Sequence, residues 1–409
     1  MKFKMQNTIL LYIIPCVILL FSISSYKLIP FAVPDGLDFN NIYSYERCDK
    51  VLSQKKFSGD IYLATGTDCG DAMGRGYVYP PLLYLTLTPF KYFKTFPSAL
   101  LAWRIIIITS LLICIFLFLG SLKSFLLTLP ITVLMFLQFP MLFALERGNN
   151  DILLIILWTL SFVSYNKKYY KLCGFLAMSS VFMKVYPLFP FSMLLAGILI
   201  SAIINFKHGI KDKLALNFIK GSILAFVVNM LIFPKFWYSF LVKISGFASM
   251  ALNLSFLNHS IQDIFEKRSV AMLSYIIAMT IWIIYYRYAK SDNSKKVFFA
   301  GVLSISTFYS NVTYDYNLIT TYPLIIVIFC SLIEQFKTKQ FVVLLFILIG
   351  IFGNRLYFEH SSQAILKLRF ALQFISLIMI ALIDLPYKRL SNIFKMYKYD
   401  LKLKLQGQS

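Results

Sequence analysis

The stretch SALLAWRIIIITSLLICIFLFLG at residues 98–120 contains a single charged residue, Arg104. A transmembrane α-helix needs roughly 20 consecutive apolar residues, so this stretch is long enough to cross a bilayer. Similar runs recur along nearly the whole chain, of which 59% of residues are hydrophobic and 14% charged, with a mean hydropathy of +0.72. A soluble domain has about 45–50% apolar and about 25% charged residues. We therefore predict an all-α polytopic membrane protein with about 11–13 transmembrane helices.

The formal net charge of +22 comes from short clusters of Lys and Arg between the apolar runs. Such clusters mark the cytoplasmic ends of membrane helices, and this distribution argues against nucleic acid as a partner. We place four of them inside: Lys167–Lys171, Lys207–Lys213, Arg287–Lys296 and Lys337–Lys339. The outer turns then fall near 145–151, 184–190, 235–269, 311–317 and 354–368. The basic tail at 387–409 is expected to be cytoplasmic, where it contacts anionic headgroups or is simply solvated.

Residues 79–145 start and end outside in this orientation, so they need an even number of crossings. They contain three apolar runs, at 82–96, 98–120 and 124–145. One arrangement makes the first run, which is short and broken by Pro89, re-entrant or interfacial. The other folds back the third run, which contains Pro130 and Pro140. The sequence does not choose between them.

We expect one membrane domain over residues 1–409, with the apolar run Ile9–Ile23 as its first helix and residues 30–78 as its first extracytoplasmic loop. The alternating aromatic residues of this loop are typical of short amphipathic helices on a membrane surface. Cys48 and Cys69 both lie in the loop. If the loop faces an oxidising compartment these cysteines form a disulfide, and otherwise they stay free thiols.

Polar and ionisable residues gather in the predicted outer turns, where such groups are costly next to lipid and mark functional sites. They are Asp35, Asp38, Tyr79, Glu146–Asp151, Lys184–Pro187, Asn258–Ser260, Tyr314–Asn317, Arg355 and His360. A carboxylate can accept a proton from a hydroxyl, and Arg and Lys can hold a phosphate group. Together these residue types suit a reaction between a lipid-phosphate donor and a hydroxyl acceptor.

Within this set, seven short motifs follow one another: Leu37-Asp38-Phe39-Asn40-Asn41-Ile42-Tyr43, Gly59-Asp60-Ile61-Tyr62, Tyr77-Val78-Tyr79-Pro80-Pro81-Leu82, Arg147-Gly148-Asn149-Asn150, Met183-Lys184-Val185-Tyr186-Pro187, Asn258-His259-Ser260 and Tyr314-Asp315-Tyr316-Asn317. Their types and order resemble the integral-membrane glycosyltransferases of the GT-C type. The greatest resemblance is to glycosyltransferase family 87, the polyprenol-phosphate-mannose-dependent mannosyltransferases. The resemblance implies a GT-C-type helical bundle that uses a sugar on polyprenyl phosphate.

In such enzymes the acidic residue after the first helix is the catalytic base, which points to Asp38 with Asp35 as the competitor. The alternative for Asp38 is a loop residue that caps a helix. Two departures from the family pattern stand out. The late segment lacks the family's histidine, so Asp315 or Tyr316 takes its place, and His259 stands where glutamine is more usual.

The candidate residues for binding substrate or its phosphate are Tyr79, Arg147, Asn149, Asn150, Lys184, Tyr186, His259, Asp315, Asn317 and Arg355. Among them Arg147, Lys184 and Arg355 carry the positive charge that a leaving phosphate needs. Structural alternatives remain for three segments. Arg147 can instead pair with Glu146, residues 149–151 can cap the next helix, and Lys184 can extend to the headgroups.

The expected activity is inverting transfer of mannose or another hexose from polyprenyl phosphate to a hydroxyl of a lipid- or glycan-linked acceptor. We expect it at the outer face of a bacterial cytoplasmic membrane, with membrane lipids, the sugar donor and a glycolipid or glycan acceptor as partners. No cofactor is implied, and a divalent cation is neither required nor excluded. The alternative functions are a lipid-linked oligosaccharide polymerase or ligase, and a flippase for lipid-linked sugars.

Overall fold

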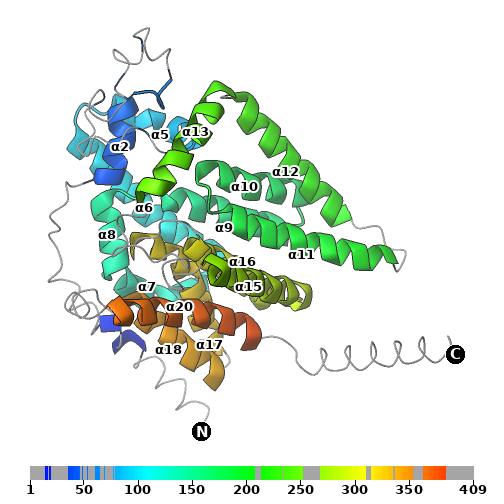
Figure 1. Cartoon of the computed structure of the whole chain (residues 1–409). Coiled ribbons are helices and arrows are strands. Elements are labelled where there is room, and N and C mark those ends of the chain that lie inside the picture. The colour runs from blue at the N-terminus through cyan, green and yellow to red at the C-terminus, as the bar shows by residue number, and fades with distance from the viewer. Residues whose placement is uncertain are drawn as a thin grey trace.

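The structure, a computed structural model, describes residues 14–16, 18–19, 36–46, 48, 53, 60–64, 69, 77, 79–207, 213–232, 234–251, 268–309, 315–334, 337–352 and 363–383. All regular secondary structure within these ranges is helical, which confirms the predicted all-α fold (Figure 1). Asp35, His259, Arg355, the tail at 387–409 and most of the predicted first helix lie outside the described residues.

Five stretches of the described chain are long and apolar enough to cross a membrane. They are α6 (Phe96–Leu119), α11 (Leu188–Lys207), α12 (Lys213–Ile232), α15 (Arg268–Tyr288), and the 3-10 helix η5 (Asp315–Thr321) with α17 (Tyr322–Glu334). Shorter apolar helices accompany them: α9 (Asp151–Asn166), α10 (Tyr170–Met183), α18 (Thr338–Phe352) and α20 (Gln363–Ile383). The protein is therefore a polytopic membrane protein. The figure of 11–13 crossings depends on these shorter helices and stays a prediction.

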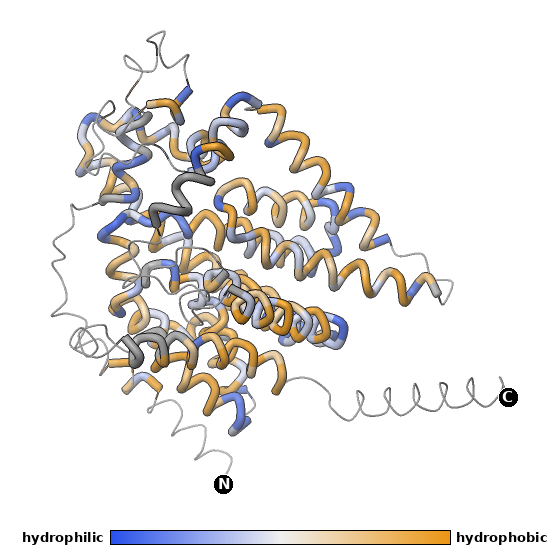
Figure 2. The backbone as a smooth tube through the Cα atoms, viewed as in Figure 1, coloured by the Kyte–Doolittle hydropathy of each residue, from blue (hydrophilic) through white to orange (hydrophobic). Residues whose placement is uncertain are grey.

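The outside of the helices is apolar, as lipid surroundings require. The exposed fractions of Leu101, Ile203 and Leu231 are 60%, 58% and 72%. Figure 2 shows apolar residues along the helices, whereas hydrophilic residues concentrate near the helix ends and around α2, α5 and α8. A water-soluble protein rarely exposes so much contiguous apolar surface, so hydrocarbon is the natural neighbour of these faces.

The structure answers the question left open for residues 79–145. The run 82–96 forms α5 (Pro81–Leu87) and the 3-10 helix η2 (Thr88–Tyr92), both far too short to span a hydrocarbon core of about 30 Å. The third run forms α7 (Leu122–Phe136) and α8 (Phe139–Arg147), which meet at an angle of 66°. Proline in the first turn of α8 explains the break, because Pro140 lacks the N–H that would continue the preceding helix.

Contacts at the two ends of α6 show that the chain crosses and returns. Near the start of α6, Arg104 Nε donates a hydrogen bond of 2.8 Å to the carbonyl of Leu145 in α8. At the far end of α6, Lys296 Nζ donates to the carbonyl of Leu119 at 2.8 Å. The bent pair α7–α8 thus returns to the end where α6 began, which agrees with the even number of crossings expected for the predicted orientation.

Helices α16 (Asp292–Ser306) and α17 lie at the centre of the bundle. Every residue from Val297 to Ser306 is buried, and so is every residue from Tyr322 to Leu332. Trp158 Nε1 in α9 donates a hydrogen bond of 2.6 Å to the carbonyl of Phe299 in α16. This packing holds η5, which precedes α17, against α8 and α9.

Two glycines let α10 and α12 pack closely. A Cβ atom on Gly221 would lie 1.8 Å from the carbonyl oxygen of Lys171, and one on Gly174 would lie 2.1 Å from that of Phe218. The backbones therefore approach more closely than any larger residue permits, a common way to join helices in a membrane.

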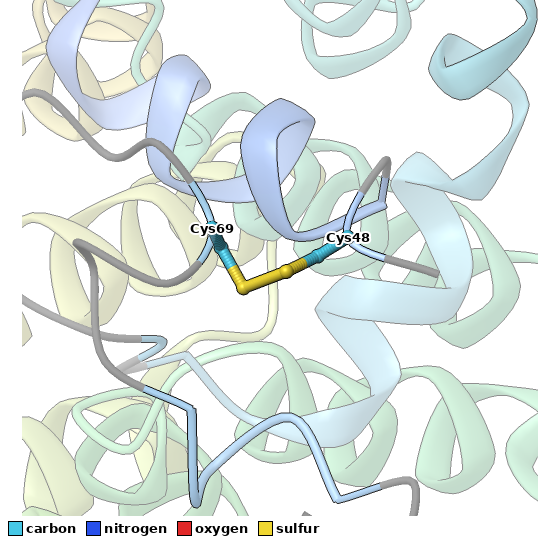
Figure 3. The surroundings of a disulfide bond; sticks show 2 residues. All are labelled: Cys48 and Cys69. Carbon is cyan, nitrogen blue, oxygen red and sulfur yellow. A yellow bond between two sulfur atoms is a disulfide. The ribbon is translucent and has the colours of Figure 1, made fainter. Parts of the chain in front are cut away.

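The first loop carries helix α2 (Leu37–Glu46) and a disulfide between Cys48 and Cys69 (Figure 3). The disulfide was one of the two outcomes left open by the sequence. The entry to α2 is fixed by Gly36, which has a φ of 71° and donates its N–H to the carbonyl of Glu146 at 2.7 Å. A side chain on Gly36 would also collide with Phe96. The start of α2 is therefore held across the shared end of α6 and α8.

Candidate active site

The turn between α8 and α9 forms the centre of the candidate site. Gly148 ends α8 with a φ of 63°, and a Cβ atom there would lie 2.6 Å from the Cβ of Phe39 in α2. Trp103 Nε1 donates to the carbonyl of Gly148 at 3.0 Å and stacks on the Phe39 ring, with centroids 6.0 Å apart. Only glycine fits this left-handed conformation and close contact without strain. The turn is consequently clamped between α2 and α6.

Asp38 in the first turn of α2 forms a bidentate ion pair with Arg147 at the end of α8. Arg147 Nε donates to Oδ2 at 2.9 Å, and Nη2 donates to Oδ1 at 2.7 Å. The side chains are 5% and 14% exposed, respectively. Such a planar, bidentate pair is among the strongest charge-assisted contacts. The sequence did not predict this pairing, because it suggested only Glu146 as a structural partner for Arg147.

A second ion pair lies on the other side of the turn. Asp151, the first residue of α9, is fully buried and pairs with Lys184, the residue that follows α10. Asn317 Nδ2 in η5 donates to the second carboxylate oxygen of Asp151. The structure therefore brings Lys184 and Asn317, two of the candidate residues, together on Asp151. Lys184 is 15% exposed and does not extend to the headgroups.

The two asparagines of the turn differ in their bonding. Asn149 Oδ1 accepts a hydrogen bond of 2.6 Å from the backbone N–H of Asp151, so this residue holds the start of α9. Asn150 occupies the N-cap position of α9 but makes no side-chain capping bond, although it is only 2% exposed. Asn149 therefore bonds the first N–H of α9 from outside the helix, whereas Asn150, the N-cap residue, makes no capping bond.

Tyrosines connect the turn to the first loop. Lys184 Nζ lies 6.0 Å from the centroid of the Tyr79 ring, within range of a cation–π contact. The Tyr79 carbonyl accepts a hydrogen bond of 2.6 Å from the hydroxyl of Tyr62 in the loop. Tyr186, two residues after Lys184, is buried.

Beside Tyr62 the loop is bonded to α13 (Pro234–Ala251), which follows α12. Ser239 donates to the Asp60 carboxylate, and Lys243 Nζ donates to the Tyr62 carbonyl at 3.0 Å. Burial lowers the pKa of Lys243, and the charge of Asp60 opposes that shift. Burial also raises the pKa of Tyr62, helped by Asp60. These contacts make α13 part of the same polar cluster.

Sequence reasoning placed Asp151 in the polar group Glu146–Asp151 but left it out of the candidate site residues and gave it no role beyond the start of a helix. Its position directly before an apolar run, next to Asn149 and Asn150, was the available signal. Three other predictions, for Asp35, His259 and Arg355, fall outside the described residues. Asp315 opens η5, and its side chain also lies outside the described part.

A cavity of about 230 Å³ lies at the opposite end of the bundle, between α6, α16 and α17. Its lining includes Asp292, Lys296 and Glu334. Since Lys296 bonds to the far end of α6, this cavity is remote from Asp38 and is not part of the candidate site. In the described ranges, no three His, Cys, Asp or Glu side chains gather as a metal ion would require.

Comparison with known families gives one match. A family model described as glycosyltransferase family 87 matches residues 77–312. The matched range contains the turn at 147–151, Lys184 and Tyr79, whereas Asp38 and Asn317 lie on either side of it. No curated protein and no solved structure matches the chain.

Proposed function

The chain belongs to glycosyltransferase family 87, and we propose that it transfers a hexose, such as mannose, from a polyprenyl-phosphate donor to a hydroxyl of a lipid- or glycan-linked acceptor. Glycosyl transfer follows from the family. The donor, the acceptor and the residue roles are the proposal. It is supported by the apolar bundle, which can hold a polyprenyl tail, and by the resemblance of the outer motifs to polyprenyl-phosphate-dependent enzymes.

The observation that carries the proposal is the pair Asp38–Arg147 at the surface end of the bundle. A carboxylate that can accept a proton lies next to a guanidinium that can hold a phosphate. Glycosyl transfer from a phosphate needs these two groups close together, because the attacked anomeric carbon lies between the acceptor hydroxyl and the leaving phosphate.

In the proposed mechanism, Asp38 takes the proton of the acceptor hydroxyl as the oxygen attacks the anomeric carbon. The bond from that carbon to the phosphate oxygen breaks, its electrons leave with polyprenyl phosphate, and the configuration inverts. Both oxygens of Asp38 accept a bond from Arg147 in the structure. The donor phosphate competes for the same guanidinium, so its arrival releases a carboxylate oxygen for the acceptor. Lys184 is proposed to add positive charge near the phosphate.

We place the reaction on the extracytoplasmic face of a bacterial cytoplasmic membrane. The disulfide of the first loop supports that side, because disulfides persist in oxidising compartments and are rare in the cytosol. The same loop carries Asp38. The positive-inside distribution of Lys and Arg agrees with this orientation.

The test is transfer from radiolabelled polyprenyl-phosphate mannose or glucose to glycolipid acceptors by the purified protein. General base catalysis contributes about 10²–10⁴-fold, so Asp38→Asn is expected to lower kcat by at least about 100-fold. Asp292→Asn, at the opposite end of the bundle, is the matched control and should keep full activity. Full activity of folded Asp38→Asn would refute the assignment of the base. Transport of a donor without transfer from any donor would favour a flippase instead.

A further inference from the structure

Asn150 is a buried amide with unused hydrogen-bonding capacity at the centre of the site. Its side chain is 2% exposed, and neither Oδ1 nor Nδ2 has a hydrogen-bond partner in the part of the chain that the structure describes. Leaving such a group unsatisfied costs about 1–3 kcal/mol, so buried amides without a partner are rare and usually serve a purpose. Its neighbour Asn149, by contrast, holds the backbone of Asp151.

The position of Asn150 ties this unused capacity to the reaction. It lies between Arg147, which binds Asp38, and Asp151, which binds Lys184. Arg147 is three residues before Asn150, and Asp151 is the next residue. Consecutive Cα atoms are about 3.8 Å apart, so one partner of each ion pair lies close to Asn150 along the chain. The left-handed Gly148 and the Asn149 bond fix the backbone on both sides. The amide is therefore held in place without taking part in holding the turn.

The two unsatisfied atoms indicate which chemical group fits. Nδ2 donates and Oδ1 accepts. An ionised phosphate only accepts, so it would leave Oδ1 unsatisfied. A sugar hydroxyl both donates and accepts, and two neighbouring hydroxyls on a ring can satisfy both atoms of one amide.

Resting on the proposed function, we infer that Asn150 binds ring hydroxyls of a sugar substrate and contributes to the choice of sugar. The sugar is the hexose of the donor or the saccharide of the acceptor, which offer the same chemistry. The phosphate is left to Arg147 and Lys184. Asn150 is thus a specificity-determining residue rather than a helix cap.

The test replaces Asn150 with leucine, which has a similar shape and no polar atom. Loss of two neutral hydrogen bonds is expected to lower kcat/KM by about 10- to 100-fold. The melting temperature should not fall, because the substitution removes an unsatisfied buried group. The matched control is Asn229→Leu in α12. Its buried amide already donates to the Ala225 carbonyl at 2.7 Å, so this variant should be less stable yet keep its kcat/KM.

Deoxy substrates identify the sugar. Removal of the contacted hydroxyl from the donor should weaken transfer by the wild-type protein and have no further effect on Asn150→Leu. If only deoxy acceptors show this coupling, the amide binds the acceptor. The inference is overturned if Asn150→Leu responds to every deoxy substrate as the wild type does.

A binding measurement separates this inference from the proposed function. If the wild type transfers from no polyprenyl-phosphate sugar, the proposed function fails, and saturation-transfer NMR with methyl hexopyranosides then decides the role of Asn150. Saturation of the sugar protons by the wild type and by Asn229→Leu, but not by Asn150→Leu, supports the inference. Equal saturation by all three proteins, or none by the wild type, refutes it.

Discussion

At the scale of single residues, two ion pairs determine the electrostatics of the site. Arg147 pairs with Asp38, and Lys184 pairs with Asp151, and both carboxylates are almost completely shielded from solvent. A shielded ion pair adds little net stability, but losing one partner leaves an uncompensated charge and is strongly destabilising. The two pairs should therefore behave as units in mutagenesis.

We predict that Lys184→Met lowers the free energy of unfolding by about 3–5 kcal/mol, because the fully buried Asp151 is left charged and unpaired. Adding Asp151→Asn should restore part of that loss, since the amide removes the charge and can still accept from Asn317. Thermal unfolding in detergent micelles measures both effects, with the exposed Lys290→Met as control. A double variant no more stable than Lys184→Met would show that charge pairing is not the cause.

The sequence predicted most residues of the site but not their partners. Asp38 and Arg147 are 109 residues apart, and Asn317 lies 166 residues from Asp151. Nothing local determines which cation meets which carboxylate, so the sequence suggested the adjacent Glu146 as a partner for Arg147 and not Asp38. Proximity follows only once α2 is fixed over the ends of α6 and α8, by the bond from Gly36 to Glu146 and the close contact of Phe39 with Gly148.

At the scale of helices, the backbones of α10 and α12 approach each other closely at Gly221 and Gly174. We predict that Gly221→Ala destabilises the protein by about 1–3 kcal/mol, because the new methyl group meets the backbone of Lys171, which cannot turn aside. In Gly197→Ala the new methyl group meets the Tyr286 side chain, whose nearest atom would lie at 2.7 Å, rather than a backbone atom. The melting temperature of Gly197→Ala should therefore fall less than that of Gly221→Ala, because a side chain can give way where a helix backbone cannot. An equal loss in both variants would contradict the close backbone contact.

The helices themselves were easier to predict than their bends. Apolar runs near 20 residues gave α6, α11, α12 and α15 directly. Two prolines in the run 124–145 offered two places for a break, yet Pro130 lies inside the continuous helix α7 while Pro140 opens α8. Proline in a membrane helix is tolerated when neighbouring groups satisfy the freed carbonyl, so its effect depends on packing that the sequence does not contain.

At the scale of the whole molecule, the site and the basic clusters lie at opposite ends of the bundle. We predict that an impermeant maleimide labels Tyr92→Cys in intact cells, because this position is 78% exposed at the end that carries the first loop. Lys290→Cys, in a basic cluster at the other end, should be labelled only after permeabilisation. Both variants are made in a protein that keeps the Cys48–Cys69 disulfide and in which the free cysteines have been substituted. The reverse labelling pattern would place the site on the cytoplasmic face.

The predicted all-α membrane class and the predicted orientation in the membrane follow from composition and from the distribution of charge. Both are averaged over the whole chain, so a wrong boundary for a single helix does not change them. The family match confirms the resemblance seen in the outer motifs. The single-domain organisation stays a prediction.

The two ion pairs have a consequence for the course of the reaction. Asp38, Arg147, Lys184 and Asp151 together carry no net charge. A polyprenyl phosphodiester with one negative charge becomes a phosphomonoester with two as the sugar leaves, while Asp38 loses its own charge by taking the acceptor proton. The reaction as proposed therefore moves a negative charge from the carboxylate to the phosphate, and Arg147 can stay beside it throughout. A site bordering hydrocarbon, where new charge is costly, then completes the transfer with its total charge unchanged.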